Sequence, residues 1–308
     1  MNSLEVNQLS KSYINGKTRV DAIKNLSFEV GSNELFGIIG PDGAGKTTLF
    51  RILSTLLNPD SGTARVLGLD TVKDYKQIRK KVGYMPGRFS LYQDLTVEEN
   101  LEFFATIFNT NIQKNYELIE PIYKQIEPFK TRKAGALSGG MKQKLALSCA
   151  LIHKPEILFL DEPTTGVDPV SRKEFWEMLA NLKSFGLSIL VSTPYMDEAE
   201  RCDRIALIQK GEFLGIDTAA GISASFPKPL FQVYKGSNHH LRKALLQHPA
   251  VRSCYPFGEN LHITFQDSVN NPQTVLTEAG FPELDARRID AGIEDCFMEL
   301  MPLEDEIG

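Results

Sequence analysis

The segment from Gly40 to Thr47 constrains the fold of this chain more than any other feature. It reads Gly40-Pro41-Asp42-Gly43-Ala44-Gly45-Lys46-Thr47 and matches the phosphate-loop pattern G-x-x-x-x-G-K-S/T without a mismatch. The apolar run 35–39 before it predicts a buried strand, and residues 46–57 after it have a helical pattern. A glycine-rich turn between strand and helix aims backbone N–H groups and the positive end of the helix at one spot, which favours phosphate. The alternative is a chance glycine loop at a helix start.

Three side chains in or directly after this segment suit a nucleoside triphosphate. Lys46 supplies a full positive charge for the β- and γ-phosphates. The hydroxyl of Thr47 can ligate Mg²⁺, and Thr48 is placed to meet the α-phosphate. We therefore predict that ATP and Mg²⁺ are the ligands of this loop.

A second motif downstream argues against the chance reading. The apolar run 157–160 ends in Asp161 and Glu162. Four apolar residues before two carboxylates place both acids at the carboxyl end of a buried strand, beside the phosphate loop. Asp161 is predicted to hold the magnesium shell, and Glu162 is predicted to polarise the attacking water as a general base. The alternative is a strand end with two solvated acids.

The third motif, Leu137-Ser138-Gly139-Gly140-Met141-Lys142-Gln143, resembles the L-S-G-G-x-x-Q signature of ATP-binding cassette (ABC) proteins. Phosphate loop, signature and acidic pair occur in the order and at the spacing of that family, over roughly residues 1–218. The resemblance implies a dimer in which Ser138, Gly139 and Gly140 contact the γ-phosphate held by the facing chain. Ser138 is also a good N-cap for a helix, and both roles are compatible.

The resemblance assigns two further positions. Tyr13 matches the aromatic residue that stacks on adenine, with a packing tyrosine in an early strand as the alternative. Asp168 belongs to the loop that crosses the dimer interface in the family, and it is equally a plausible N-cap for the helix that follows.

Two positions depart from the family pattern. Gly87 stands where the family has a glutamine that helps coordinate Mg²⁺, and Gln93 lies six residues further on. Pro194 stands where the family usually has a histidine that contacts the γ-phosphate, and proline offers no donor. We therefore predict a weak hydrolysis site, and slightly favour a heterodimer with a complete second ABC ATPase over a slow homodimer.

Length and pattern predict two domains. The chain has 308 residues, which suits one large and one small domain. The resemblance implies an α/β, P-loop ABC-type nucleotide-binding domain at 1–218 with a helical subdomain at about 88–150. Residues 219–308 read as strand, helix, two strands, helix and strand, which predicts a small α+β ferredoxin-like accessory domain.

Composition limits the partners. Lys plus Arg number 34 and Asp plus Glu 39, giving a net charge of −5, which argues against nucleic acid. No run approaches the roughly 20 apolar residues that cross a bilayer, and the N-terminus lacks the basic and apolar regions of a signal peptide. We expect a cytoplasmic chain, peripheral on the inner face of the cell membrane, with its four cysteines as free thiols.

The resemblance points to the ATPase subunits of drug-export and ABC-2-type exporters. It implies an ATP-hydrolysing subunit that energises an integral membrane permease, multidrug transport being one candidate. In the family the segment after Gly87 receives a short coupling helix of the permease, and Phe89, Leu91 and Tyr92 are predicted as its apolar receptor, with helical-subdomain core as the alternative. The alternative functions are a regulatory cassette beside a catalytically complete partner, and a soluble non-transport ABC protein that acts on ribosomes or as a regulator.

Overall fold

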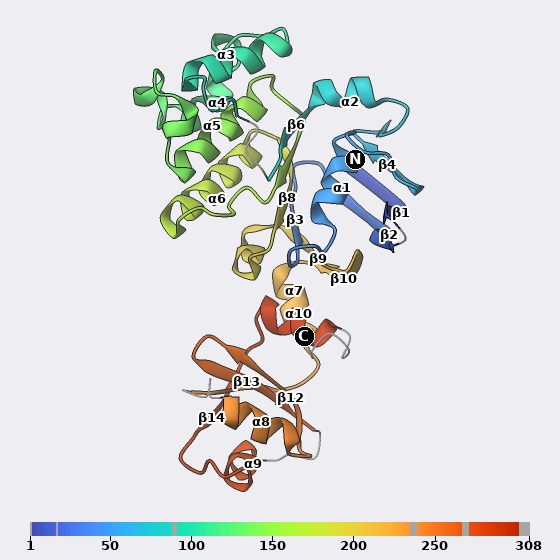
Figure 1. Cartoon of the computed structure of the whole chain (residues 1–308), viewed down its shortest axis with the longest axis vertical. Helices are drawn as coiled ribbons and strands as arrows, with labels where there is room; N and C mark the ends of the chain where they lie inside the picture. Colours follow the sequence, from blue (N-terminus) through green and yellow to red (C-terminus); the bar gives the residue numbers. More distant parts are fainter. Residues whose placement is uncertain (1, 17, 88–90, 235–238, 267–270, 302–308) are drawn as a thin grey trace. The chain divides into compact units, whose positions relative to one another are not determined.

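The chain divides into two compact units, residues 1–219 and 220–308 (Figure 1). The computed structural model describes residues 2–16, 18–87, 91–234, 239–266 and 271–301. Among the described residues, the first unit has two sheets and two buried hydrophobic clusters, and the second unit has one sheet and one cluster of its own.

A six-stranded sheet forms the centre of the first unit. Its order is β10-β9-β3-β8-β7-β6, and all neighbours are parallel except β10 and β9. Every residue of β3, β7 and β8 is buried because the sheet is covered on both faces. The strands are β3 Leu35–Ile39, β6 Val82–Met85, β7 Ile157–Asp161, β8 Ser188–Thr193, β9 Arg204–Gln209 and β10 Glu212–Asp217.

An antiparallel sheet of order β2-β1-β4-β5 covers one side of the unit. Its strands are β1 Asn2–Asn15, β2 Thr18–Gly31, β4 Ser61–Val66 and β5 Leu69–Asp70. Helix α1 (Lys46–Leu53) lies between the two sheets in Figure 1, and Phe50 packs edge-on against Phe159 of β7. The antiparallel sheet thereby holds the phosphate loop and α1 from one side.

Helices cover the other side of the six-stranded sheet (Figure 1). The helices on this side are α3 Val97–Ile107, α4 Tyr116–Tyr123, α5 Gly139–Leu151 and α6 Pro169–Ser184. Helix α2 Tyr75–Lys81 instead lies at the antiparallel sheet, next to β5. The 3-10 helices are η1 Gln113–Asn115, η2 Glu127–Phe129, η3 Ala134–Ala136 and η4 Met196–Arg201. A capping box between Thr96 and Glu99 fixes the start of α3, since each side chain accepts the other's backbone N–H.

Helix α1 is shorter than predicted, ending at Leu53 rather than near residue 57. The Ser54 hydroxyl donates to the carbonyl of Phe50, and Thr55 has a left-handed backbone with φ +62°. A β-branched residue rarely takes that conformation, and it cannot continue a helix. The apolar periodicity beyond Leu53 therefore belongs to a turn.

The second unit confirms the predicted element order. Its antiparallel sheet has the order β12-β13-β11-β14. The elements are α7 Ala219–Ala224, β11 Leu230–Val233, α8 His239–Gln247, β12 Val251–Phe257, β13 Asn260–Phe265, α9 Pro272–Glu278, β14 Ala286–Ile289 and α10 Ile293–Leu300. Helix α10 is tied to this sheet by a buried pair, since His262 Nδ1 lies 2.6 Å from Asp295 Oδ1.

Within the described residues, no helix has the length and apolarity needed to span a bilayer. The four cysteines are free thiols. Burial raises the pKa of Cys149 and Cys202, so these thiols stay protonated and unreactive at neutral pH.

Candidate nucleotide site

The loop between β3 and α1 depends on glycine at two positions. A Cβ at Gly40 would lie 2.1 Å from the carbonyl oxygen of Ile208. Gly45 has φ +107°, and a Cβ there would lie 2.3 Å from the carbonyl oxygen of Ala22. Because backbone fills both spaces, only glycine lets the loop turn this tightly against its neighbours. Ala22, on β2, is a neighbour of the site that the sequence did not indicate.

The remaining loop residues differ in exposure. Asp42 and Gly43 are exposed, while Ala44 is buried and its carbonyl accepts the N–H of Gly211. The carbonyl of Pro41 accepts the N–H of Ala44, which closes the turn. The exposed part of the loop is therefore free to meet a ligand while its base is fixed.

Lys46 is buried, with 3% of its surface exposed. Its ammonium donates to the carbonyls of Gly40 and Pro41 at 2.7 and 2.9 Å. It also lies 2.9 Å from Glu162 Oε1. These three oxygens hold the ammonium at the loop, and Glu162 balances its charge.

Asp161 ends β7 and is almost fully buried. Its Oδ1 accepts a 2.8 Å hydrogen bond from the hydroxyl of Ser192 on β8, and the Thr47 hydroxyl is a second donor to the carboxyl group. Burial raises the pKa of Asp161, and the bonds from Ser192 and Thr47 oppose that rise. Thr47 and Asp161 are therefore neighbours, as two ligands of the same metal ion must be.

Glu162 has a left-handed backbone with φ +51° and a side chain that remains 21% exposed. It borders a cavity of about 150 Å³ at the phosphate loop. The lining residues are Ala22, Gly43, Gly45, Lys46, Thr47, Thr48 and Glu162. This cavity has a cation, two hydroxyls and a carboxylate around a glycine-rich backbone, which is the chemistry of a phosphate site.

Tyr13 lies next to the loop. Its hydroxyl is 3.4 Å from Thr48 Oγ1, and 39% of its surface is exposed. Its strand, β1, is anchored just before Tyr13 by Asp60, which accepts from the ammonium of Lys11 and from the N–H and hydroxyl of Ser12. The Lys11 hydrogen bond is the main reason that the pKa of Asp60 falls to about 2. Tyr13 thus presents an exposed ring beside the phosphate loop.

Comparison with known proteins decides the family. Residues 23–165 match the model of the ABC transporter family. Over 285 residues the chain is 42% identical to the Nod factor export ATP-binding protein I of Burkholderia orbicola (strain AU 1054), covering 90% of this chain and 91% of that protein. The chain belongs to the ABC transporter ATP-binding proteins. The predicted resemblance is thereby confirmed.

Two other comparisons extend this result. The probable multidrug ABC transporter ATP-binding protein YbhF of Escherichia coli (strain K12) is 38% identical over 289 residues, which are 91% of this chain but 49% of YbhF. The chain therefore spans about half the length of that relative. The ATP-binding cassette MJ0796, solved as a dimer in a post-hydrolysis state with ADP and Pi, superposes with a TM-score of 0.63 at 26% identity, covering 70% of this chain and 98% of that one. The predicted fold class is confirmed.

The ABC signature lies at the start of α5. Ser138 is the N-cap, and its hydroxyl accepts the N–H of Met141 at 3.3 Å. Ser138 and Gly139 are exposed, whereas Gly140 is buried and a Cβ there would lie 2.6 Å from Ser171 Oγ on α6. Asp168 is the N-cap of α6, accepting from Val170 and Ser171 N–H groups. The signature therefore exposes two residues of the N-terminus of a 13-residue helix.

The two departures from the family pattern lie against this site. A Cβ at Gly87 would be 2.9 Å from the carbonyl oxygen of Asp161. Pro194 directly follows β8, and the Thr193 hydroxyl before it accepts the N–H of Tyr195. The carbonyl of Gln93 accepts the N–H of Gly135, which fixes the Gln93 backbone just before the signature.

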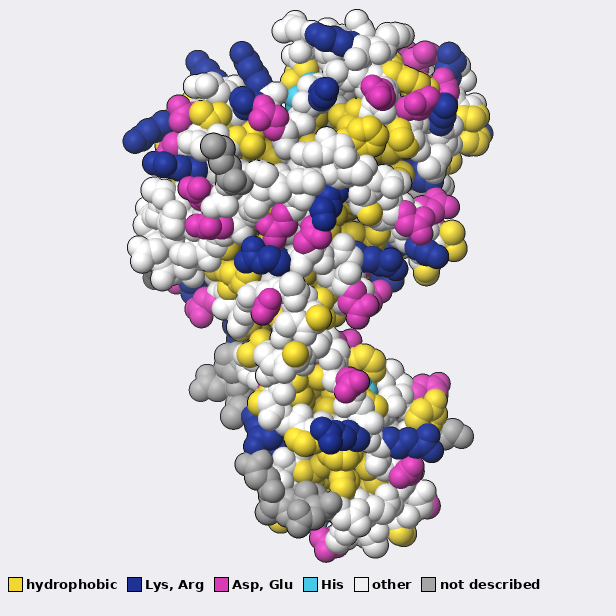
Figure 2. Space-filling view, turned by 180° about the vertical axis from the view of Figure 1, so that it is seen from behind, with side chains coloured by type: hydrophobic (Ala, Val, Ile, Leu, Met, Phe, Trp, Pro, Cys, Tyr) yellow, Lys and Arg dark blue, Asp and Glu magenta, His cyan; other side chains and the backbone are white. Residues whose placement is uncertain are grey.

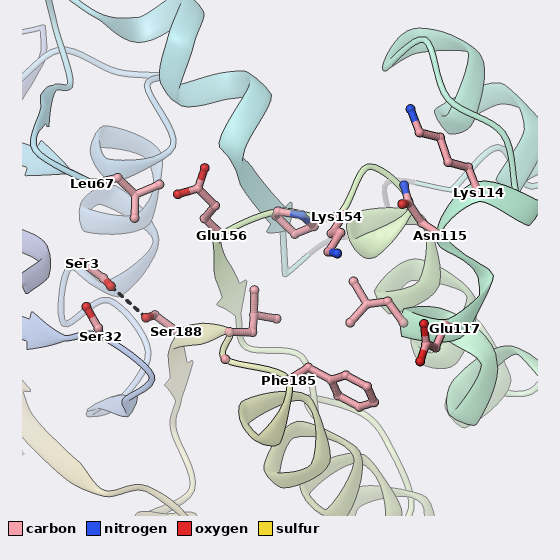
Figure 3. A pocket seen from close by; sticks show the side chains of 14 residues that line it. Ser3, Ser32, Leu67, Lys114, Asn115, Glu117, Lys154, Glu156, Phe185 and Ser188 are labelled. Atoms are coloured by element: carbon pink, nitrogen blue, oxygen red, sulfur yellow. Dashed lines mark hydrogen bonds between the residues drawn. The ribbon is translucent and has the colours of Figure 1, made fainter.

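A separate cavity of about 530 Å³ lies where β7 and β8 begin (Figure 3). Its polar pair, Ser3 and Ser188, is hydrogen-bonded at 2.8 Å, and its lining includes the exposed Lys114 and Phe185. No residue of the predicted nucleotide site lines it. The residues predicted to bind phosphate therefore lie at the opposite ends of these strands.

Proposed function

We propose that the chain is the ATP-binding and ATP-hydrolysing subunit of a membrane ABC exporter. The observation that carries this proposal is the convergence of Lys46, Thr47, Asp161 and Glu162 on one glycine-rich loop. Relatives covered along most of their length are named Nod factor export ATP-binding proteins, and YbhF is named a probable multidrug one. Multidrug compounds are one candidate cargo.

Mg²⁺ fits the residues present. Asp161 is a buried carboxylate beside the Thr47 hydroxyl, and hard oxygen donors of this kind hold Mg²⁺ together with substrate phosphates. When bound, Mg²⁺ neutralises charge on the β- and γ-phosphate oxygens. Thr47 and Asp161 are the proposed ligands.

The remaining groups of the loop have separate roles. In this structure Glu162 Oε1 lies 2.9 Å from the Lys46 ammonium. When ATP binds, its γ-phosphate takes the place of Glu162 as the anionic partner of that ammonium. Glu162 is then free to accept a proton from the attacking water as general base. Thr48 and the backbone of residues 40–45 bind phosphate oxygens, and Tyr13 stacks on the adenine.

A second ABC ATPase chain completes the site. Ser138 and Gly139 are exposed at the start of α5, where helix N–H groups favour an anion, and Gly140 lets this helix approach α6 closely. We propose that these three residues contact a γ-phosphate held by the facing chain. Because Gly87 and Pro194 leave two family groups missing, a heterodimer with a complete partner is slightly favoured over a homodimer.

An apolar groove is the proposed contact with the permease. It has a volume of about 370 Å³ and lies between α1, α2 and β6 on one side and α3 and α5 on the other. Leu56 and Ile107 line it with 59% and 55% of their surface exposed. Burial lowers the pKa of His153 in its wall to about 4, so this ring stays neutral and stacks on Phe108. A short apolar helix suits such a groove better than a charged segment.

The predicted receptor for that helix needs correction at Leu91. Leu91 is buried, with 8% exposed, and belongs to the core cluster of the helical region, so the core alternative holds for it. Tyr92 is 49% exposed and packs edge-on against Phe103. Phe89 lies outside the described residues. The proposed receptor is therefore the groove at Leu56 and Ile107, which the sequence did not indicate.

Nucleic acid is not a proposed partner. On the face shown in Figure 2, Lys and Arg side chains alternate with Asp and Glu side chains over the first unit. Such a mixed surface does not create the single-sign field that a phosphate backbone requires. We propose that the chain works at the inner face of the cell membrane, bound to its permease.

ATP binding provides the first test. We expect Lys46→Ala to weaken ATP binding at least about tenfold, because charge-assisted hydrogen bonds to the phosphates are lost. Lys114→Ala, which removes an exposed lysine of the other cavity, should leave binding unchanged. The measurement is titration of the purified chain with a fluorescent ATP analogue, and a native chain that ignores the analogue contradicts the proposal.

The groove provides a second test. We expect Ile107→Glu to weaken association with the membrane protein that co-purifies with the chain at least about tenfold, since it places a charge in an apolar contact. Phe185→Glu is the control, because Phe185 is a similarly exposed apolar residue at the other cavity. Equal association of the native chain, Ile107→Glu and Phe185→Glu with the membrane protein counts against a permease at this groove. Co-purification of the chain with ribosomes instead of a membrane protein also counts against it.

A further inference from the structure

Ser192 is a fully buried residue near the end of β8, and its hydroxyl touches both residues of the acidic pair. Its Oγ donates to Asp161 Oδ1 at 2.8 Å and accepts the N–H of Glu162 at 3.0 Å. The carbonyl of Ser192 is also 3.1 Å from the Glu162 nitrogen. A hydroxyl has one proton to donate and lone pairs to accept with, so both side-chain bonds can exist together.

The sheet fixes this position from both sides. Ser192 pairs in parallel register with Asp161 of β7 and with Ile38 of β3, the strand that leads into the phosphate loop. The backbone of Ser192 is therefore fixed between the strand that leads into the phosphate loop and the strand that carries the acids. The bond to Asp161 Oδ1 places its hydroxyl at the acidic pair.

Glu162 needs such a partner because its backbone is left-handed, at φ +51°. For a residue other than glycine, this conformation is destabilising and persists only where neighbouring groups hold it. The Ser192 hydroxyl and carbonyl both accept the Glu162 N–H, and so they hold the turn that aims the carboxylate at Lys46.

We propose that Ser192 is a positioning residue that orients the Asp161 carboxylate toward bound Mg²⁺ and fixes the turn at Glu162. This inference rests on the proposed function. Ser192 touches neither nucleotide nor water in this role and acts only through the two acids. Removing its hydroxyl should loosen the metal-binding geometry. The hydrogen bonds of the Ser192 hydroxyl go to Asp161 and Glu162, so we expect the phosphate loop to keep its metal-free affinity.

The chain contains a matched control in the same strand. Ser188 opens β8 and is also buried, and its hydroxyl bonds to Ser3 (Figure 3). The same hydroxyl accepts the N–H of Asn33. Ser188→Ala therefore removes a buried hydroxyl with a similar number of bonds, at the opposite end of the strand from the acids. A general loss of strand stability affects both variants, whereas a loss of metal positioning affects only Ser192→Ala.

The test compares binding of a fluorescent ATP analogue with excess Mg²⁺ and with EDTA. We expect Ser192→Ala to reduce the gain in affinity that Mg²⁺ provides about fivefold, the effect of one lost hydrogen bond, with the affinity in EDTA unchanged. Ser188→Ala should retain the full gain, and Ser192→Thr, which keeps the hydroxyl, should recover most of it. Thermal melting of each variant reports on folding.

Three results overturn the inference: a native Mg²⁺ gain in folded Ser192→Ala, equal weakening with and without Mg²⁺, or the same loss in Ser188→Ala. If Ser192→Ala does not fold, Ser192→Cys takes its place, because a thiol fills the space but is a weak hydrogen-bond donor. A native chain that binds no analogue in either solution refutes the proposed function itself, and so the two failures are distinguishable.

Discussion

Glu162→Gln is expected to lower ATP hydrolysis about 10²–10⁴-fold, the usual contribution of a general base. ATP binding should persist, since the substitution removes the carboxylate that competes for the Lys46 ammonium at 2.9 Å. The measurement is phosphate release at saturating MgATP, with the dissociation constant for ATP determined separately. A loss of binding together with turnover would indicate a damaged loop and not a missing base.

A glutamate at the opposite end of β7 supplies the control for this experiment. Glu156 immediately precedes β7 and pairs with Lys81 at the surface, while Glu162 follows the strand at the phosphate loop. Glu156→Gln should leave turnover within about twofold of native, because exposed ion pairs contribute little. Turnover unaffected by either substitution contradicts the role proposed for Glu162.

Blocked hydrolysis also tests the dimer. With ATP retained, the Glu162→Gln chain should accumulate as an ATP-bound dimer if two copies can face each other through Ser138. Light scattering with MgATP measures this. A dimer formed by the chain alone shows that a homodimer is possible, whereas a monomer that dimerises only with a second ABC chain supports the heterodimer.

The phosphate loop and the acidic pair could be predicted because each is a local pattern. An apolar run followed by glycines and Lys46, or by Asp161 and Glu162, specifies a buried strand and what its end carries. The element order of the second unit was predictable for the same reason, because each strand or helix has its own periodicity.

Features that depend on pairing between distant segments were not predictable. β6 has four residues including a glycine and gives no periodic signal. Leu91 looks the same in sequence whether it packs inward or outward. Ser192 lies 31 residues from Asp161, and only the parallel register of β7 and β8 brings them together. The signal available was weak: a polar residue at the end of an apolar strand next to a functional loop.

The structure separates the two departures from the family, which the sequence treats alike. Pro194→His should raise hydrolysis about 10²-fold, because an imidazole at the end of β8 supplies a donor near the γ-phosphate that proline lacks. Gly87→Gln should give no gain, since its Cβ would lie 2.9 Å from the carbonyl oxygen of Asp161 and must displace that residue or its own loop.

Phosphate release by the two single variants, the double variant and Pro194→Ala separates these effects. Pro194→Ala removes the ring without adding a donor, so it measures what loss of proline alone does to the loop. We expect the double variant to hydrolyse no faster than Pro194→His, because the Gly87 change disturbs Asp161, which the histidine cannot replace. If Pro194→His is no faster than Pro194→Ala, the slow hydrolysis predicted for this chain has another origin than the missing imidazole. If Gly87→Gln alone accelerates turnover, the backbone at Asp161 yields more readily than its burial and its bond to Ser192 imply.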